Sequence, residues 1–209
     1  MAAFERVPSG IPEMDEALDN IRLGDNVVFR VSELWEFQLF VDPYIRQAKQ
    51  DKRNIVYFRF ASHEPLVEDC PQVRTYHVPL THRFETFTVD IHNIIKKEGK
   101  DTFYVFDCLS ELQIRWATDL MMGNFFRVTC PFLFTLDTVA FFPIIRGKHS
   151  FHAINKKTLH FAPQKLSAYK NIISDFTHTY GDIVQVYDLK DTACTLYYDL
   201  EENHLMLKL

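Results

Sequence analysis

Short apolar runs that alternate with amphipathic stretches constrain the fold of this chain more than any other feature. Apolar runs without polar alternation are typical of strands buried on both faces of a sheet. The predicted strands are NVVFRV (26–31), NIVYFRFA (54–61), VRTYHVPL (73–80), TFYVFDCL (102–109), PFLFTLDTVAFF (131–142) and DIVQVYDL (182–189). The predicted helices cover residues 12–21, 44–52, 84–99, 111–126 and 163–179. The alternation predicts an α/β fold whose mostly parallel central sheet is covered by helices on both faces.

The end of the chain departs from this alternation. The segment CTLYYDLEENHLMLKL (194–209) has two strand-like halves around EEN, which predicts an antiparallel C-terminal hairpin at a sheet edge. The chain contains no internal repeat, low-complexity run or Pro/Gly/Ser-rich linker, so we expect residues 1–209 to form a single domain. With 47% hydrophobic residues, 19 Phe among them, the chain can build a substantial core.

Charge and cysteine content limit the kinds of partner and the cell compartment that we expect for this protein. The net charge of −5 argues against nucleic acid, which proteins bind through clustered Lys and Arg. No stretch approaches the ~20 apolar residues of a membrane span, and the first residues lack the apolar core of a secretory signal. Four widely spaced cysteines match no zinc motif and are expected to be reduced thiols: Cys70, Cys108, Cys130 and Cys194. We therefore expect a cytoplasmic protein without a membrane or nucleic-acid partner.

Glycine spacing excludes several consensus sites. The six glycines are Gly10, Gly24, Gly99, Gly123, Gly147 and Gly181, and no two of them lie within ten residues of each other. The phosphate-binding loop GxxxxGK[ST], the dinucleotide fingerprint GxGxxG and the hydrolase elbow GxSxG all need closely spaced glycines. None of the three consensus motifs is therefore present.

The segment after residues 26–31 stands where many α/β proteins hold a phosphate. Two carboxylates, Glu33 and Glu36, would meet a phosphate there with the wrong sign of charge. Trp35, Phe37 and Phe40 lie in the same segment. Two interpretations remain open for these aromatic residues: they fill the space of a nucleotide, or they form an exposed patch for a protein partner.

Two arginines are unusual because each stands next to last in an apolar run, Arg30 in VVFRV and Arg59 in VYFRF. Ligands of parallel α/β sheets bind beyond the carboxyl ends of the strands. One hypothesis is therefore a small-anion site formed by Arg30, Arg59 and Asp107. The other is structural ion pairing of these arginines with Asp107, Glu33 or Glu64, since a buried charge needs a partner.

The remaining polar residues give weaker indications. Asp107 and Asp137 both come at predicted strand ends, where a carboxylate can cap a helix, pair with an arginine or bind magnesium. The closest histidine pairs are His77/His82 and His149/His152, but a metal site needs three or four converging ligands. We therefore predict no metal, no cofactor and no catalytic triad.

One family resemblance emerges from these motifs. The segment SGIPEMDEAL (9–18) resembles the leading helix of KaiC-like ATPases of the RecA superfamily, where a TGIPGLDELL-type helix precedes the phosphate-loop strand. NVVFRV then falls on that strand, NIVYFRFAS on the next, and FYVFDCLSEL resembles the Walker B strand with its continuation. RGKHSFHAI (146–154) is similar to the segment after the following strand. The resemblance covers residues 7–160 and implies a RecA/KaiC-like three-layer sandwich.

The segment aligned with the phosphate-binding loop departs from the family at each functional position. It begins with Ser32 and Glu33, and Phe37 replaces a glycine. Gln38 replaces the phosphate-binding lysine, and Leu39 replaces the magnesium-binding hydroxyl. The cradle, the cation and the metal ligand are thus all missing.

The remaining alignment is also incomplete. Ala61 and Ser62 fall on the family's paired glutamates, and Glu64 could replace one only after a shift in alignment. Asp107 alone persists, at the Walker B aspartate, and Pro43 should delay or kink the helix after the loop.

The resemblance implies a pseudo-ATPase that acts in self-association, regulation or scaffolding, as a homo-oligomer or with a protein partner. The alternative is a small-anion or nucleotide-binding sensor or enzyme domain that uses Arg30 and Arg59. Related degenerate domains occur beside phosphoenolpyruvate synthase or pyruvate phosphate dikinase regions, so a link to such phosphotransfer belongs to the alternative.

Overall fold

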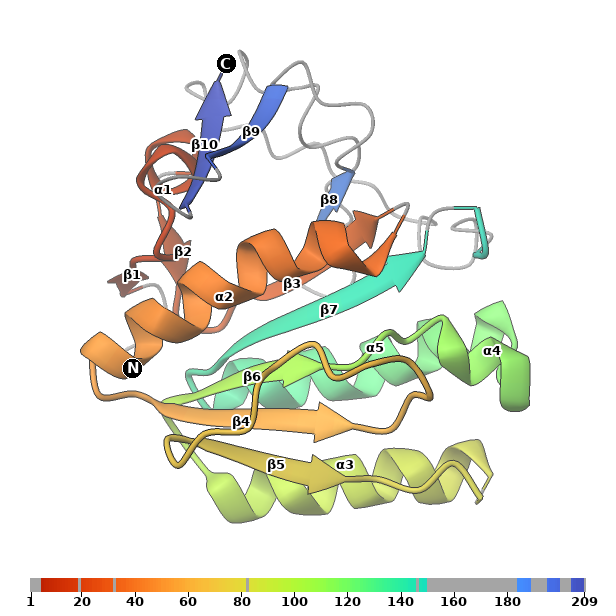
Figure 1. The fold of residues 1–209 in the computed structure, drawn as a ribbon. Helices are drawn as coiled ribbons and strands as arrows, with labels where there is room; N and C mark the ends of the chain where they lie inside the picture. The colour runs from red at the N-terminus through yellow and green to blue at the C-terminus, as the bar shows by residue number, and fades with distance from the viewer. Residues whose placement is uncertain are drawn as a thin grey trace.

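The central feature of the fold is a six-stranded sheet (Figure 1). The computed structural model describes residues 5–18, 20–31, 33–81, 83–145 and 147–149, together with the backbone of the last three strands, 184–188, 195–199 and 204–208. The sheet comprises β3 (Asn26–Val31), β4 (Asn54–Arg59), β5 (Val73–His77), β6 (Thr102–Phe106), β7 (Val139–Ile145) and β8 (Val184–Asp188). Their order is β5-β4-β6-β7-β3-β8, and every pairing is parallel. The predicted α/β class with a parallel sheet is confirmed.

Two short antiparallel pairs accompany the central sheet. β1 (Arg6–Val7) pairs with β2 (Ile21–Arg22), and β9 (Thr195–Asp199) pairs with β10 (His204–Lys208). The predicted C-terminal hairpin is therefore confirmed as antiparallel. Its predicted place at the edge of the central sheet is wrong, because among the described strands β9 and β10 form a separate two-stranded sheet, and β8 occupies the outer position beside β3.

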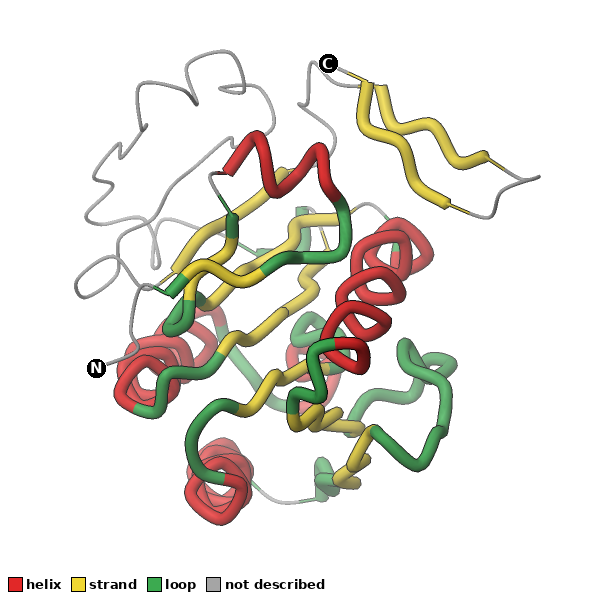
Figure 2. Tube along the Cα trace, turned by 90° about the vertical axis from the view of Figure 1, so that its left-hand side faces the viewer, coloured by secondary structure: helices red, strands yellow, loops and turns green. Residues whose placement is uncertain are grey.

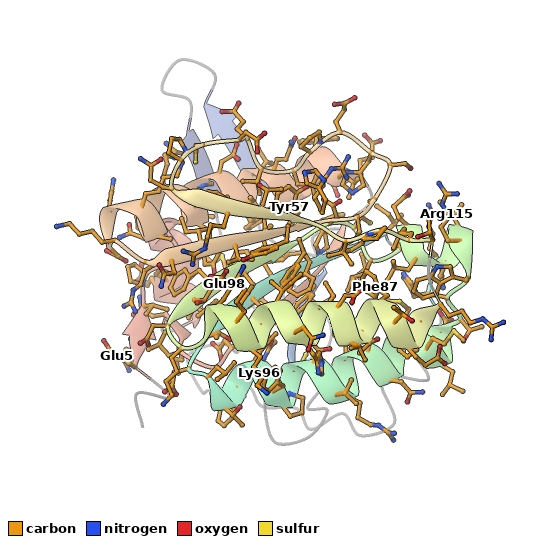
Figure 3. All side chains as sticks on the ribbon, turned by 90° about the horizontal axis from the view of Figure 1, so that it is seen from below. Glu5, Tyr57, Phe87, Lys96, Glu98 and Arg115 are labelled. Atoms are coloured by element: carbon orange, nitrogen blue, oxygen red, sulfur yellow. The ribbon has the colours of Figure 1, made fainter. Side chains whose placement is uncertain are left out.

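Helices lie on both faces of the sheet (Figures 1 and 2). α2 (Leu34–Gln50) packs on one face, close to α1 (Pro12–Leu18) and the β1–β2 pair. α3 (Phe84–Glu98), α4 (Glu111–Arg115) and α5 (Asp119–Thr135) contribute to the core on the other face. Figure 3 shows α3 and α5 side by side beneath the strands. None of the described helices is both long enough and apolar enough to cross a bilayer.

The apolar strand runs are explained by burial on both faces. Along each central strand, successive side chains alternate between the two cores. Phe29, Tyr57, Val105 and Phe141 face the α2 side, whereas their chain neighbours Val28, Phe58, Tyr104 and Phe142 face the α3–α5 side. Either face would lose its packing if polar residues alternated along these strands.

The predicted helix at 44–52 begins too late. α2 starts at Leu34, and Pro43 lies inside it rather than at its first turn. Phe37, Val41, Tyr44 and Ala48 recur at helical spacing on both sides of the proline and are buried against the sheet. The continuous apolar face therefore outweighs the hydrogen bond that Pro43 cannot donate.

The predicted helix 111–126 and strand 131–142 are also placed wrongly. Two helices replace the single one, because the Thr118 side chain accepts a hydrogen bond from the Met121 N–H (3.2 Å) and caps a new helix, α5. α5 continues to Thr135, and the strand begins only at Val139. A short apolar run such as PFLFT fits a buried helix and a buried strand equally well.

The corrected bounds of α5 and β7 also change the position of Asp137 in the fold. It lies in the turn before β7, with φ of 53°, and not after a strand as predicted. It is therefore at the amino end of the sheet, where its carboxylate approaches Lys100 at 3.9 Å. Asp137 belongs to no group of residues at the carboxyl edge.

Candidate functional site at the carboxyl edge of the sheet

Strand order defines where a ligand of this sheet would bind. From β4 the chain passes outward to β5, whereas from β6 it passes in the other direction to β7. Loops that diverge from neighbouring strands leave a crevice at their carboxyl ends, and α/β proteins bind ligands in such crevices. The loop after β4 and the loop after β6 meet here, and they carry Arg59 and Asp107.

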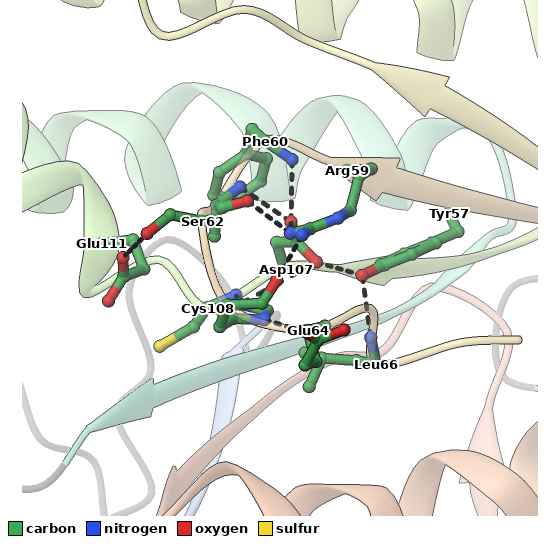
Figure 4. Close-up of polar contacts among 11 residues, drawn as sticks. Tyr57, Arg59, Phe60, Ser62, Glu64, Leu66, Asp107, Cys108 and Glu111 are labelled. Atoms are coloured by element: carbon green, nitrogen blue, oxygen red, sulfur yellow. Dashed lines mark hydrogen bonds and ion pairs between the residues drawn. The ribbon is translucent and has the colours of Figure 1, made fainter.

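Asp107 is the centre of this region (Figure 4). Its carboxylate is wholly buried, and Oδ2 accepts hydrogen bonds from the N–H groups of Phe60 and Ala61, both at 2.8 Å. Arg59 Nη1 donates to the same oxygen at 2.5 Å and forms an ion pair with it. Oδ1 accepts from the hydroxyl of Tyr57. Both carboxylate oxygens are therefore occupied by donors from β4 and the loop that follows it.

Arg59 is held from several sides. Its guanidinium contacts Asp107 through Nη1 and also donates to the carbonyl of Ala61, at 2.5 Å, and to that of His63. These carbonyls belong to the loop after β4, so the arginine folds that loop back over its own strand end. The side chain retains 15% exposure. The contacts favour the structural ion pair over an arginine that is free to bind an anion.

His63 and Tyr57 complete the network. His63 Nε2 accepts the N–H of Cys108 at 3.2 Å, which leaves Nδ1 as the protonated nitrogen that donates to the Glu64 carbonyl at 2.6 Å. The Tyr57 hydroxyl also accepts the N–H of Leu66 at 3.0 Å. Burial, followed by the nearby Asp107 carboxylate, raises the pKa of Tyr57 well above its ordinary value. The hydroxyl therefore stays protonated and available as a donor to Asp107.

Tyr57 and His63 belong to the site but were not among its predicted residues. Tyr57 stands two residues before Arg59 in the same strand, so the two side chains share a face of the sheet. The spacing of two residues in one strand could therefore have indicated that Tyr57 lies beside Arg59. The position of His63 depends on how the loop turns back, for which the sequence contains no comparable pattern.

The start of α2 is the second predicted location. The backbone N–H of Glu33 donates to the carboxylate of Glu36 at 3.3 Å, and Trp35 Nε1–H donates to the carboxylate of Glu33 at 2.9 Å. The acidic side chains thus lie at the helix N-terminus, where a phosphate would need free amides. This helix start carries its own negative charge.

The aromatic residues of this segment do not all fit the same interpretation, because some are buried and one is exposed. Phe37 and Phe40 are buried, and both pack on Phe29 of β3, with ring centroids 5.2 Å and 5.1 Å away. Trp35 is 56% exposed. Gln38 and Leu39 are partly buried on the same helix, at the positions aligned with the lysine and the magnesium ligand.

Arg30 lies farther from Asp107 than a shared anion site suggests. β7 separates β3 from β6, so the two strands are about 10 Å apart at the usual spacing of neighbouring strands. The structure describes only the backbone of Arg30, which is in register with Ile144 and Asp188. Ser32, His82, His152, Cys194 and the predicted helix 163–179 lie outside the described residues.

The remaining predicted positions have ordinary contacts. Ser62 Oγ donates to Glu111 at 3.0 Å, and Ala61 contributes only its backbone to the network. Glu64 is exposed. Cys70, Cys108 and Cys130 are free thiols, and the described residues contain no group of three His, Cys, Asp or Glu side chains that could hold a metal ion.

A surface pocket of about 330 Å³ lies beside the network, on the α2 side of β4 and β5. Its lining combines Tyr57 and Arg59 with the acidic residues Glu68 and Asp69. Because Arg59 is already paired with Asp107, the lining does not favour an anion. No family model matches the chain, and no curated protein matches it.

Proposed function

We propose that this chain is a RecA/KaiC-like domain with a three-layer arrangement that has lost its ATPase apparatus and acts in self-association, regulation or scaffolding. The observation that carries the proposal is the first turn of α2. The carboxylates of Glu33 and Glu36 occupy the helix start at which a phosphate would be bound, and they repel an anion there.

The state of Asp107 supports the same proposal. In phosphoryl transfer an aspartate at this position helps to hold magnesium through a free oxygen. Here Arg59, Tyr57 and two backbone amides use both oxygens, and the arginine already neutralises the charge. A metal ion would have to displace a buried ion pair and the hydrogen bonds that hold the Asp107 carboxylate.

The alternative, a small-anion or nucleotide sensor, depends on Arg30 and Arg59. The three backbone and side-chain acceptors of Arg59 weaken it, and the strand order separates the two arginines. The link to phosphoenolpyruvate synthase-like phosphotransfer rests on the sequence resemblance alone.

Nucleotide binding provides the test. Thermal unfolding is measured with about 1 mM Mg-ATP, Mg-ADP or inorganic phosphate against a matched salt control, since a ligand at 100 times its Kd stabilises by ~2.7 kcal/mol. We expect no change in Tm with any of them. A rise with Mg-ATP or Mg-ADP would contradict the loss of nucleotide binding. A rise with phosphate that disappears in Arg30→Met would instead support the anion sensor.

A further inference from the structure

A second polar cluster links the loops after β6 and β7. Ser110, in the loop after β6, lies with its Oγ 2.7 Å from His149 Nε2. His149 Nδ1 lies 3.1 Å from Asp119 Oδ1 in the first turn of α5. Ser110 Oγ also accepts the N–H of Ile145, the last residue of β7, at 2.8 Å. Three separate segments are thus joined through one imidazole ring.

Ser110, His149 and Asp119 are arranged like a serine nucleophile, its base and the carboxylate that orients the base. Burial excludes that role in this arrangement. Ser110 is wholly buried, and the His149 side chain is 3% exposed, so an acyl substrate has no approach to Oγ. One lone pair of the hydroxyl is also engaged by Ile145. The cluster therefore connects segments of the chain.

The proton positions follow from the partners. The Asp119 carboxylate can only accept, so Nδ1 carries the proton of the neutral ring, and Nε2 accepts the Ser110 hydroxyl. Gln113 supports the arrangement by donating to Asp119 Oδ1 at 2.6 Å. Protonation of Nε2 would turn this acceptor into a donor. The hydroxyl hydrogen of Ser110 would then lose its acceptor in a buried position, even where Oγ accepts the new Nε2–H with its second lone pair.

We propose that Ser110, His149 and Asp119 form an acid-sensitive latch, which holds residues 147–149 against the α4–α5 region when His149 is neutral and releases them when it is protonated. The proposal concerns a conformational device and does not depend on the proposed function. It rests on the two hydrogen bonds of one buried ring and on the burial of the serine hydroxyl.

Charges around the ring act in opposite directions. Burial lowers the pKa of His149, the Asp119 carboxylate of α5 raises it, and the Lys148 ammonium of the same segment lowers it. Burial is the largest of these effects. Among the described residues, the polar neighbours Ser110 of the ring and Gln113 of Asp119 are uncharged. The neutral ring is therefore the form that the folded latch favours. The latch is complete above the ordinary histidine pKa and weakens as the pH falls below it.

Hydrogen exchange of the Ile145 amide tests the latch, because its N–H is bonded to Ser110. Protection, corrected for intrinsic exchange, is compared at about pH 7.5 and about pH 5.5. We expect it to fall by about tenfold in acid, whereas the Val105 amide in the neighbouring strand keeps its protection. In His149→Phe, which keeps an aromatic ring, protection of Ile145 should be low and equal at both pH values.

His92→Phe is the matched control, because His92 is a partly buried histidine whose pKa is likewise lowered by burial. It should retain the acid response of Ile145. The latch is refuted if wild-type protection is the same at both pH values, or if the acid response persists in His149→Phe. If that variant does not fold, NMR titration of His149 in the wild-type protein decides. A pKa below the ordinary value, with parallel loss of Ile145 protection, supports the latch; a titration that leaves this protection unchanged overturns it.

Discussion

At the scale of single residues, the buried pair of Arg59 and Asp107 is the most consequential interaction of the carboxyl edge. A carboxylate without exposure would be costly if it were unpaired, and four donors surround this one. The pair also fixes the loop after β4, because Arg59 donates to two of its carbonyls. Stability and local conformation thus depend on one guanidinium.

Replacing Arg59 by methionine should destabilise the protein by about 3–5 kcal/mol, since it leaves a buried carboxylate without its counter-charge. Arg74→Met is the control: Arg74 pairs with Glu98, which is 6% exposed, but the arginine is 49% exposed and Tyr76 also donates to Glu98, so the loss should be smaller, about 1–2 kcal/mol. Urea unfolding of both variants measures the difference. Similar losses in the two variants would show that the Asp107 network contributes little.

Asp25 offers a stabilising substitution. Burial raises its pKa from 3.8 to about 6, so the ionised carboxylate opposes folding at neutral pH, and this penalty disappears as the pH falls through 6 towards 3.8. Asp25→Asn should therefore raise the free energy of unfolding by about 1–3 kcal/mol near pH 7.5, and by progressively less towards pH 4. Unfolding curves across this range check the sign. A constant difference would show that ionisation of Asp25 is not its cause.

Several residues of the network could be anticipated. Arg59 and Asp107 stand out because charges inside or directly after apolar strands require partners, and their pairing was one of two explicit alternatives. The contacts of His63 could not be foreseen, because they depend on the path of the loop after β4. Asp137 was misplaced for a local reason: the run PFLFT does not distinguish a buried helix from a buried strand.

At the scale of secondary structure elements, α2 governs how the N-terminal segment packs. Gly10 has φ of +86°, and a Cβ built on it would lie 2.4 Å from the carbonyl oxygen of Pro43. The backbone of residue 10 therefore approaches the middle of α2 as closely as glycine alone permits. The long α2 was not predicted, because Pro43 suggested a helix start, whereas the apolar periodicity around it indicated continuity.

Gly10→Ala should destabilise the protein by at least about 2 kcal/mol, because the methyl group clashes with backbone and the φ angle is unfavourable. Gly147→Ala is the matched control. Gly147 also has a positive φ, of +75°, but a Cβ there meets no atom within 4 Å. Its loss should be about 1 kcal/mol, from the φ angle alone. Thermal or urea unfolding compares the two, and equal losses would contradict the close contact with α2.

At the scale of the whole molecule, the strand order is the feature that could not be predicted from the sequence. The apolar runs indicated parallel strands, but no local pattern places β7 between β3 and β6. Such pairing joins residues far apart in the chain and is decided by the packing of both faces together. The hypothesis of one anion site containing Arg30 and Arg59 did not take this separation into account. The pairing of Arg59 with Asp107 required only that β4 and β6 be neighbours.

The proposed self-association makes a direct prediction about mass. Light scattering of the 24.7 kDa chain should give a multiple of the monomer mass that decreases on dilution or remains constant if assembly is tight. The resemblance to ring- and filament-forming proteins motivates this expectation. A monomer mass at all concentrations would remove self-association from the proposal and leave regulation or scaffolding through another protein.

The arrangement of β3 between β7 and β8 has a consequence for biosynthesis. β3 is the first strand of the central sheet to leave the ribosome, yet both of its hydrogen-bonding partners are made much later, as residues 139–145 and 184–188. Until then this apolar strand has two open edges, which readily pair with foreign strands. Nascent chains halted before Val139 should consequently be far more prone to aggregate than those released beyond Asp188.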